Sequence, residues 1–231
     1  MFEADNRVKL YLAHVIYDAE RYNDAADIVR QLVESKYIVP AEDRMLLVNI
    51  WLGIINPHRT AILNIKDMKS SDHLHLALSE MSETLNKLLD EIIEIIQMQI
   101  ISQSIEEEGK AIYYKFLADF QRYKLDCIDS SQIPQIASDS KNNYTKALTI
   151  FQGQATHNAE LIFSTNLNLS ILLADYLDQK DKALEIINQQ HTELSMSIEK
   201  YPLEQRQRMQ DLVELMAENI QRWKPQQEGD M

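Results

Sequence analysis

The stretch Tyr113-Tyr114-Lys115-Phe116-Leu117-Ala118-Asp119 decides how this sequence is interpreted. Its apolar residues recur at the spacing of an α-helix. The acidic run Glu106-Glu107-Glu108 precedes it, at the end of a helix where the dipole favours negative charge. The sequence therefore predicts a helix over about 105–128, with this stretch near its middle.

The helical period continues on both sides of this stretch, along almost the whole chain. Only 4 glycines and 5 prolines occur in 231 residues, so tight turns are few and the elements are long. We expect one all-α domain of about nine antiparallel helices over 1–224, followed by a short polar tail, 225–231. The other expected helices span about 4–19, 22–36, from after Pro40, from Asp72 to 104, from Pro134 to 152, 157–178, 181–199 and 203–223.

Pro57 interrupts the helix expected after Pro40. A proline inside a helix removes one hydrogen bond and presses on the carbonyl four residues earlier, which here belongs to Gly53. Asn56 is biased away from helical geometry because it precedes the proline. The sequence predicts a kink or a break near 53–57.

Composition excludes several classes of function. A formal charge of −13 argues against general nucleic-acid binding, which needs a basic face. Acidic residues interrupt every long apolar stretch, so we expect no membrane span and no secretory signal. The single cysteine, Cys127, has no internal partner and fits a reducing, cytoplasmic compartment.

The sequence offers no convincing catalytic, metal or cofactor site. The six histidines form no Glu-x-x-His pair of the kind that builds a di-iron centre, and His73-x-His75 is most simply solvated surface. No glycine-rich loop is present to cradle a phosphate. Cys127 lacks a neighbouring histidine that would lower its pKa. We expect a protein without cofactors that is not an enzyme.

Five stretches, in order along the chain, resemble the 14-3-3 family of phosphoserine- and phosphothreonine-binding adaptors. The central stretch over 113–119 is one of them. The others are Ala19-Glu20-Arg21-Tyr22-Asn23-Asp24, Glu42-Asp43-Arg44-Met45-Leu46-Leu47, Leu167-Asn168-Leu169-Ser170 with Asp175, and Asn219-Ile220-Gln221-Arg222-Trp223. The resemblance implies a concave groove in which an extended phosphopeptide lies, usually within a dimer.

Carried over residue by residue, the resemblance implies a reduced set of phosphate ligands. Arg59 occupies one arginine position, and Lys115 replaces a second arginine without its planar fork. Phe116 replaces a tyrosine, and Leu52 and Leu63 replace a lysine and a third arginine. Two lost donors would cost about 3–6 kcal/mol, on the order of 10²–10⁴ in affinity. Two nearby cationic candidates to compensate are Lys66 and His58.

The same resemblance implies that the peptide-backbone side of the groove is better preserved. Asn168, Asn219 and Trp223 match the family, and Asp175 stands for a glutamate. The apolar wall would consist of Leu167, Ile171, Leu212 and Leu215.

For dimerisation, Val15, Ala19 and Ala61 keep the apolar contact that the resemblance implies. Arg21 and Asp24 match charged family positions. Their usual partners fall near Thr84 and Glu80, so Asp24 would face a like charge. We expect a homodimer, or a heterodimer with a related chain.

Three functions follow from these observations. The first is a divergent adaptor that binds phosphorylated segments of partner proteins through Arg59 and Lys115. The second is a structural or dimerisation partner of the same fold that binds unphosphorylated or acidic segments. The third, a scaffold resembling tetratricopeptide repeats, draws on Ala19–Ala26 and 144–148, but no steady 34-residue period is present.

Overall fold

The computed structural model describes residues 2–66, 68, 72–103, 106–152 and 159–224. Over these residues the chain forms nine α-helices and no strand, as the sequence predicts. They are α1 (Phe2–Asp18), α2 (Tyr22–Glu34), α3 (Arg44–Lys66), α4 (Asp72–Glu94), α5 (Glu107–Lys124), α6 (Ile133–Gln152), α7 (Ala159–Asp175), α8 (Lys180–Ser197) and α9 (Leu203–Trp223). The expected tail, 225–231, lies outside the described residues.

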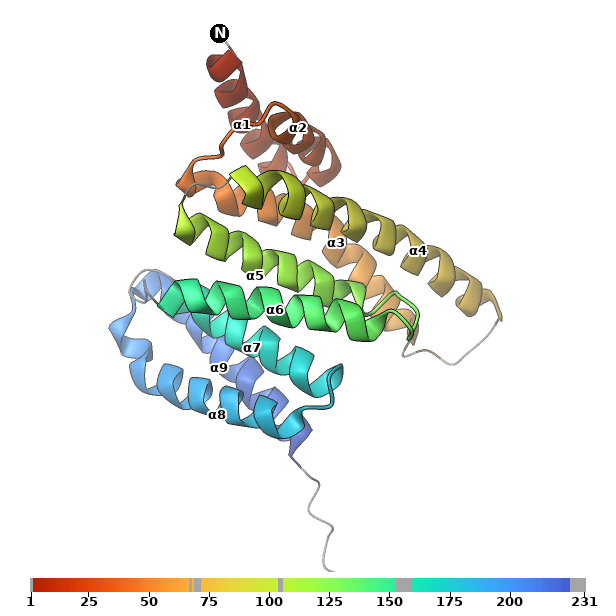
Figure 1. The fold of residues 1–231 in the computed structure, drawn as a ribbon, viewed down its shortest axis with the longest axis vertical. Coiled ribbons are helices and arrows are strands. Elements are labelled where there is room, and N and C mark those ends of the chain that lie inside the picture. The colour runs from red at the N-terminus through yellow and green to blue at the C-terminus, as the bar shows by residue number, and fades with distance from the viewer. Residues whose placement is uncertain (1, 67, 69–71, 104–105, 153–158, 225–231) are drawn as a thin grey trace, which may run out of the picture.

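The helices stack in chain order, with α1 and α2 at one end and α8 and α9 at the other (Figure 1). Helix α5 lies in the middle and contacts α3, α4, α6 and α7. Eleven of its 18 residues are buried, among them the charged Lys115 and Asp119. The array is therefore an irregular helical stack, in which α3, α5, α7 and α9 follow one another as neighbours.

Two clusters of buried side chains hold the stack together. The first joins α1–α6 and includes Trp51, whose ring meets Phe120 edge-on at 6.3 Å between centroids. The second joins α5–α9 and includes Tyr144 and Trp223. Because α5 and α6 contribute to both clusters, they link the two halves of the chain.

The predicted break in the third helix is wrong. Helix α3 is continuous from Arg44 to Lys66 and contains Pro57. Ile55 and Ile62 are fully buried on either side of the proline, so packing holds both turns in place. This tertiary packing outweighs the lost backbone hydrogen bond. The predicted kink without a break stays a prediction.

Gly53 has a tertiary role that its sequence position did not reveal. A Cβ atom added there would lie 2.6 Å from Cγ and Cδ1 of Tyr22, closer than real contacts allow. The Tyr22 ring on α2 therefore packs directly against the α3 backbone. Tyr22 also meets Tyr17 of α1, with 5.7 Å between ring centroids.

The helix expected from Asp72 to 104 changes type before its end. The α-helix stops at Glu94, and the chain continues as a π-helix, Ile95–Ile100, and a 3₁₀ turn, Ile101–Gln103. Clustered β-branched isoleucines crowd the turns of an ordinary α-helix. In this arrangement Ile95 and Ile96 are buried while Met98 is exposed.

Candidate functional site

One face of α5 carries a line of charged residues between α3 and α7. Lys115, Asp119 and Arg122 follow one another at intervals of four and three residues, and Asp126 lies just beyond the last turn. This spacing places their side chains on the same face of a helix. Arg59 from α3 and Asn168 from α7 join the line from either side.

Asp119 is the centre of a buried polar network. Its carboxylate accepts hydrogen bonds from Lys115 Nζ (2.6 Å), Tyr144 Oη (2.5 Å) and Asn168 Nδ2 (2.8 Å). Lys115 and Asp119 are only 7% and 2% exposed. Burial raises the pKa of the Tyr144 hydroxyl well above its ordinary value, and the Asp119 charge acts in the same direction. Tyr144 is therefore a neutral donor to the carboxylate.

Arg59 lies between an aromatic ring and a carboxylate. Its guanidinium carbon is 3.7 Å from the centroid of the Tyr123 ring. Its Nη2 donates to Asp126 Oδ2 at 3.2 Å, and Tyr176 Oη donates to the other Asp126 oxygen at 2.6 Å. Arg59 Nε is buried and has no hydrogen-bond partner among the described residues. The arrangement already holds one oxyanion group, the Asp126 carboxylate.

Lys66 and His58, the two candidates for extra positive charge, lie at different places in the structure. Lys66 Nζ donates to the main-chain carbonyl of Asp126 at 2.7 Å, so it lies at the Arg59 site. His58 instead lines a shallow hollow with Tyr22, Gly53 and Pro57. That hollow lies toward α2. The structure therefore brings Lys66 to the Arg59 site and places His58 elsewhere.

The residues expected to contact the peptide backbone lie on α7 and α9. Asp175 accepts hydrogen bonds from Trp223 Nε1 (3.1 Å) and Arg222 Nη2 (2.7 Å). Arg222 also donates to Asn219 Oδ1 at 3.0 Å, while Asn219 Nδ2 donates to the Leu215 carbonyl. These bonds fix the orientation of the Asp175 carboxylate and of the Asn219 side-chain amide.

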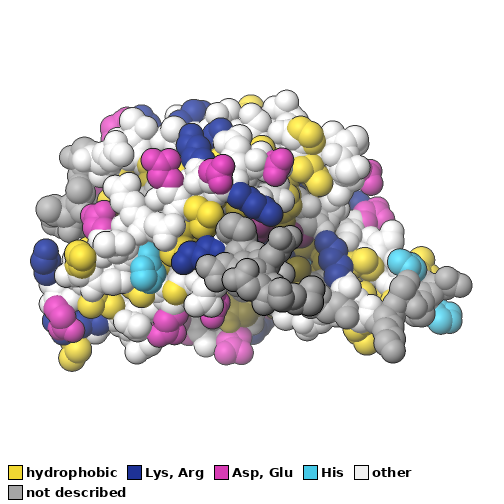
Figure 2. Space-filling model, turned by 90° about the horizontal axis from the view of Figure 1, so that it is seen from below, with side chains coloured by type: hydrophobic (Ala, Val, Ile, Leu, Met, Phe, Trp, Pro, Cys, Tyr) yellow, Lys and Arg dark blue, Asp and Glu magenta, His cyan; other side chains and the backbone are white. Residues whose placement is uncertain are grey.

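The expected apolar wall is divided by burial. Leu167 is buried in the core, Ile171 and Leu212 are half-buried, and Leu215 is exposed. The last three can therefore contact a ligand, whereas Leu167 mainly packs inside. Seen from below, the molecule shows apolar side chains flanked by basic and acidic ones (Figure 2).

The sequence interpretation missed Arg122, Asp126 and Tyr176. Arg122 Nε donates to Tyr144 Oη at 3.4 Å, and its guanidinium lies 4.9 Å from the Tyr123 ring centroid. The spacing from Lys115 through Asp119 and Arg122 was a signal that could have revealed this face. Tyr176 gave no local signal, because only the fold brings it to Asp126.

The residues expected at a dimer interface lie mainly on the surface. Val15 and Ala19 are exposed and Ala61 is half-buried. Arg21 and Asp24 form an ion pair with each other, with Arg21 Nη2 and Asp24 Oδ2 2.6 Å apart. Helix α1 also exposes Val8, Tyr11 and Leu12, which share a face with Val15.

Cys127 has no reactive character. Burial raises the pKa of its thiol to about 11, with the charge of Asp126 acting in the same direction. Its Sγ donates to the Lys124 carbonyl. The thiol is therefore protonated near neutral pH and is a poor nucleophile.

Comparisons with known proteins agree with this architecture. The family model described as 14-3-3 protein matches residues 12–224. A 14-3-3 protein of Giardia intestinalis is 21% identical, over 96% of this chain and 94% of the relative. The 14-3-3 protein homolog 2 of Echinococcus multilocularis is 20% identical (98% and 94%), and 14-3-3 protein 10 of Solanum lycopersicum is 23% identical (93% and 90%).

The fold just described is that of a helical adaptor. The chain belongs to the 14-3-3 family. Members of this family are regulatory adaptors without enzymatic activity, which confirms the prediction that the chain is not an enzyme. Among the described residues, no helix is both long enough and apolar enough to cross a membrane.

Proposed function

We propose that the protein is a regulatory adaptor that binds phosphorylated segments of partner proteins, and that Arg59 is its principal phosphate contact. Lys66 adds positive charge next to it, and Lys115 contributes through the Asp119 network. Asn168, Asn219 and Asp175 contact the peptide backbone, and the buried Trp223 orients Asp175 through its indole N–H. Ile171, Leu212 and Leu215 supply apolar contacts, and Leu167 supports them from the core.

The observation that carries this proposal is the state of the Arg59 guanidinium. It holds a carboxylate oxygen at 3.2 Å and retains a buried Nε–H group without a partner among the described residues. Buried polar groups in folded proteins almost always have partners. A phosphate offers more acceptor oxygens than the carboxylate does and can satisfy both nitrogens in the bidentate geometry that arginine favours.

Asp126 then acts as an internal competitor for the phosphate. Its carboxylate occupies Arg59 and receives the Tyr176 hydroxyl, so an incoming phosphate must displace it or be repelled by it. The charge of a phosphoserine, about −1.5 to −2 at pH 7, exceeds that of the carboxylate and favours the exchange. Affinity should be modest because the exchange breaks an existing ion pair.

The experiment is a fluorescence-anisotropy titration with short peptides that carry a central phosphoserine, each paired with its unphosphorylated form. Arg59→Ala should weaken phosphopeptide binding at least about tenfold, because a hydrogen bond to a charged group contributes roughly 1.5–3 kcal/mol. Asp126→Asn should strengthen binding severalfold, because it removes the competing charge and keeps the side-chain shape. Lys87→Ala, on the exposed ion pair with Glu83 of α4, is the matched control and should leave binding unchanged.

Equal affinities for phosphorylated and plain peptides would contradict the proposal. So would phosphopeptide affinity that Arg59→Ala leaves intact in a variant with unchanged helical circular dichroism. Equal affinities would support the alternative of an adaptor that no longer needs phosphate. Two observations favour that alternative. Leu63 is exposed where the family resemblance implies an arginine. Arg59 and Lys115 already form ion pairs with carboxylates of the chain itself.

We also propose a dimer, a homodimer or a heterodimer with a related chain, formed through the exposed face of α1. This face presents a contiguous apolar surface, and such surfaces mark sites of protein–protein contact. It is formed by Val8, Tyr11, Leu12 and Val15. Leu12→Glu should convert a dimer to a monomer in sedimentation-velocity experiments, whereas Lys9→Glu on the same helix should not. A wild-type chain that sediments as a monomer at tens of micromolar, or a Leu12→Glu variant that stays dimeric, would contradict this interface.

The lone, half-buried Cys127 suits a cytoplasmic location for the assembly.

A further inference from the structure

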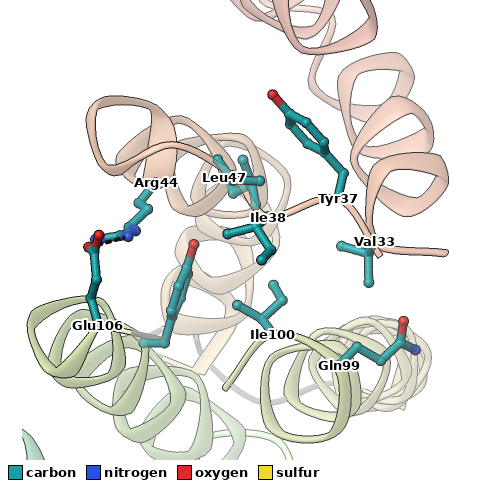
Figure 3. A pocket seen from close by; sticks show the side chains of 10 residues that line it. Val33, Tyr37, Ile38, Arg44, Leu47, Gln99, Ile100 and Glu106 are labelled. Atoms are coloured by element: carbon teal, nitrogen blue, oxygen red, sulfur yellow. Dashed lines mark hydrogen bonds and ion pairs between the residues drawn. The ribbon is translucent and has the colours of Figure 1, made fainter. Parts of the chain in front are cut away.

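A cavity of about 170 Å³ lies away from the Arg59 site, where the chain between α2 and α3 meets α3, the π-helix and α5. Figure 3 shows Val33, Ile38, Leu47 and Ile100 pointing toward its interior. Its charged groups lie at one end, where Arg44 and Glu106 meet, and Tyr37 and Gln99 lie on the other side. The cavity therefore has an apolar wall and a charged end.

The size of the cavity limits what it can hold. An engineered apolar cavity of about 150 Å³ in another protein stays dry and binds benzene. This cavity is slightly larger, so it accommodates one aromatic ring or a short alkyl chain. Small-molecule sites typically combine such apolar walls with a few well-placed polar groups.

Arg44 supplies positive charge at the polar end. It is 7% exposed, and its Nη2 donates to Glu106 Oε2 at 2.8 Å. The structure shows no hydrogen bond from its other N–H groups to any described residue. The Glu106 side chain is 63% exposed, so this carboxylate reaches Arg44 from the rim and can swing into solvent.

Tyr113 supplies a second donor. It lines the cavity, is 3% exposed, and its hydroxyl has no hydrogen bond to any residue that the structure describes. Burial raises the pKa of this hydroxyl to about 12, and the positive charge of Arg44 opposes that rise. The hydroxyl therefore carries its proton at neutral pH and can donate a hydrogen bond.

The π-helix shapes one wall. Gln99 and Ile100 line the cavity from the last positions of the segment Ile95–Ile100. In Figure 3, the side chain of Ile100 faces that of Ile38, which belongs to the chain segment after α2. Short π-helical turns occur frequently at functional sites in other proteins. Here the turn aims an apolar side chain into the cavity.

We propose that this cavity binds a small apolar carboxylic acid in its ionised form. Its ring or short chain lies against Val33, Leu47 and Ile100. Its carboxylate accepts hydrogen bonds from the Tyr113 hydroxyl and from Arg44, in place of Glu106. This site is separate from the phosphopeptide surface and does not depend on the function proposed for that surface.

The test is a calorimetric titration of the full chain with 3-phenylpropionate, octanoate and the neutral amide 3-phenylpropionamide. At least one carboxylate should bind with a Kd below about 1 mM, a modest affinity for a ligand of this size. The amide should bind at least about tenfold more weakly, because it lacks the charge that Arg44 recognises. Tyr113→Phe should weaken carboxylate binding about tenfold to a hundredfold, since it removes one hydrogen bond to a charged group.

Two further variants locate the binding. Ile100→Phe should abolish it by filling the cavity, with the helical circular dichroism spectrum and thermal midpoint as checks on folding. Leu76→Phe, at an exposed position of α4, should leave it unchanged. The proposal is overturned if neither carboxylate binds, if the amide binds equally well, or if a folded Tyr113→Phe or Ile100→Phe variant keeps wild-type affinity.

Discussion

Replacing Asp119 by alanine should lower the free energy of unfolding by about 3–5 kcal/mol, the usual cost of breaking a buried ion pair by removing one partner. The substitution would leave the ammonium of Lys115 without its carboxylate at a position that is 7% exposed. It would also remove the acceptor of the Tyr144 hydroxyl and of the Asn168 amide. Urea denaturation followed by circular dichroism measures the change.

Two control variants make this prediction specific to the buried network. Asp5→Ala breaks an exposed pair with Lys9 and should change stability by less than about 1 kcal/mol. The double variant Lys115→Met/Asp119→Ala should be more stable than Asp119→Ala alone, because no unpaired charge remains buried. A loss below about 1 kcal/mol for Asp119→Ala would show that the network contributes little.

Replacing Gly53 by valine should cost about 3 kcal/mol of stability, near the upper end for overpacked sites. The first added carbon alone would lie 2.6 Å from the Tyr22 ring, and the two methyl groups of valine would add further crowding. Helix propensity works in the opposite direction, because glycine is the poorer helix former, so the steric effect must exceed that gain. The measurement is again the free energy of unfolding in urea.

A second substitution tests whether the Tyr22 ring is the cause. Combining Gly53→Val with Tyr22→Ala should cost less than the sum of the two single changes, with a coupling of at least about 1 kcal/mol. Thr60→Val, an exposed site on the same helix, should change stability by only a few tenths of a kcal/mol. A Gly53→Val variant as stable as the wild type would mean that α2 can move away without cost.

Periodicity predicted the helices well because the stack buries one stripe of each helix, and such stripes recur at the helical period. It predicted the course of the chain less well at Pro57 and at Ile95–Ile100. At both positions local preference competes with packing from other helices, which a single sequence does not display. The packed core decided in favour of a continuous α3 and against a uniform α4.

The candidate site was also only partly predictable from the sequence. The residue types at Arg59, Lys115, Asn168 and Asp175 were evident in the sequence, and the structure places all four on α3, α5 and α7. Their partners were not evident. Asp126 meets Arg59 across 67 positions of the chain, and Asn168 meets Asp119 across 49.

The sequence by itself determined that this protein is an all-helical member of the 14-3-3 family, and it predicted fewer phosphate-binding cations than the family resemblance implies. Helical periodicity and residue type are local properties, so a single chain displays them. Only the tertiary structure decided that Arg59 and Lys115 are each engaged by an internal carboxylate, and that Tyr113 and Arg44 share a cavity. Ion pairs, cavities and unpartnered donors depend on distances between helices, and those distances arise only when the helices pack.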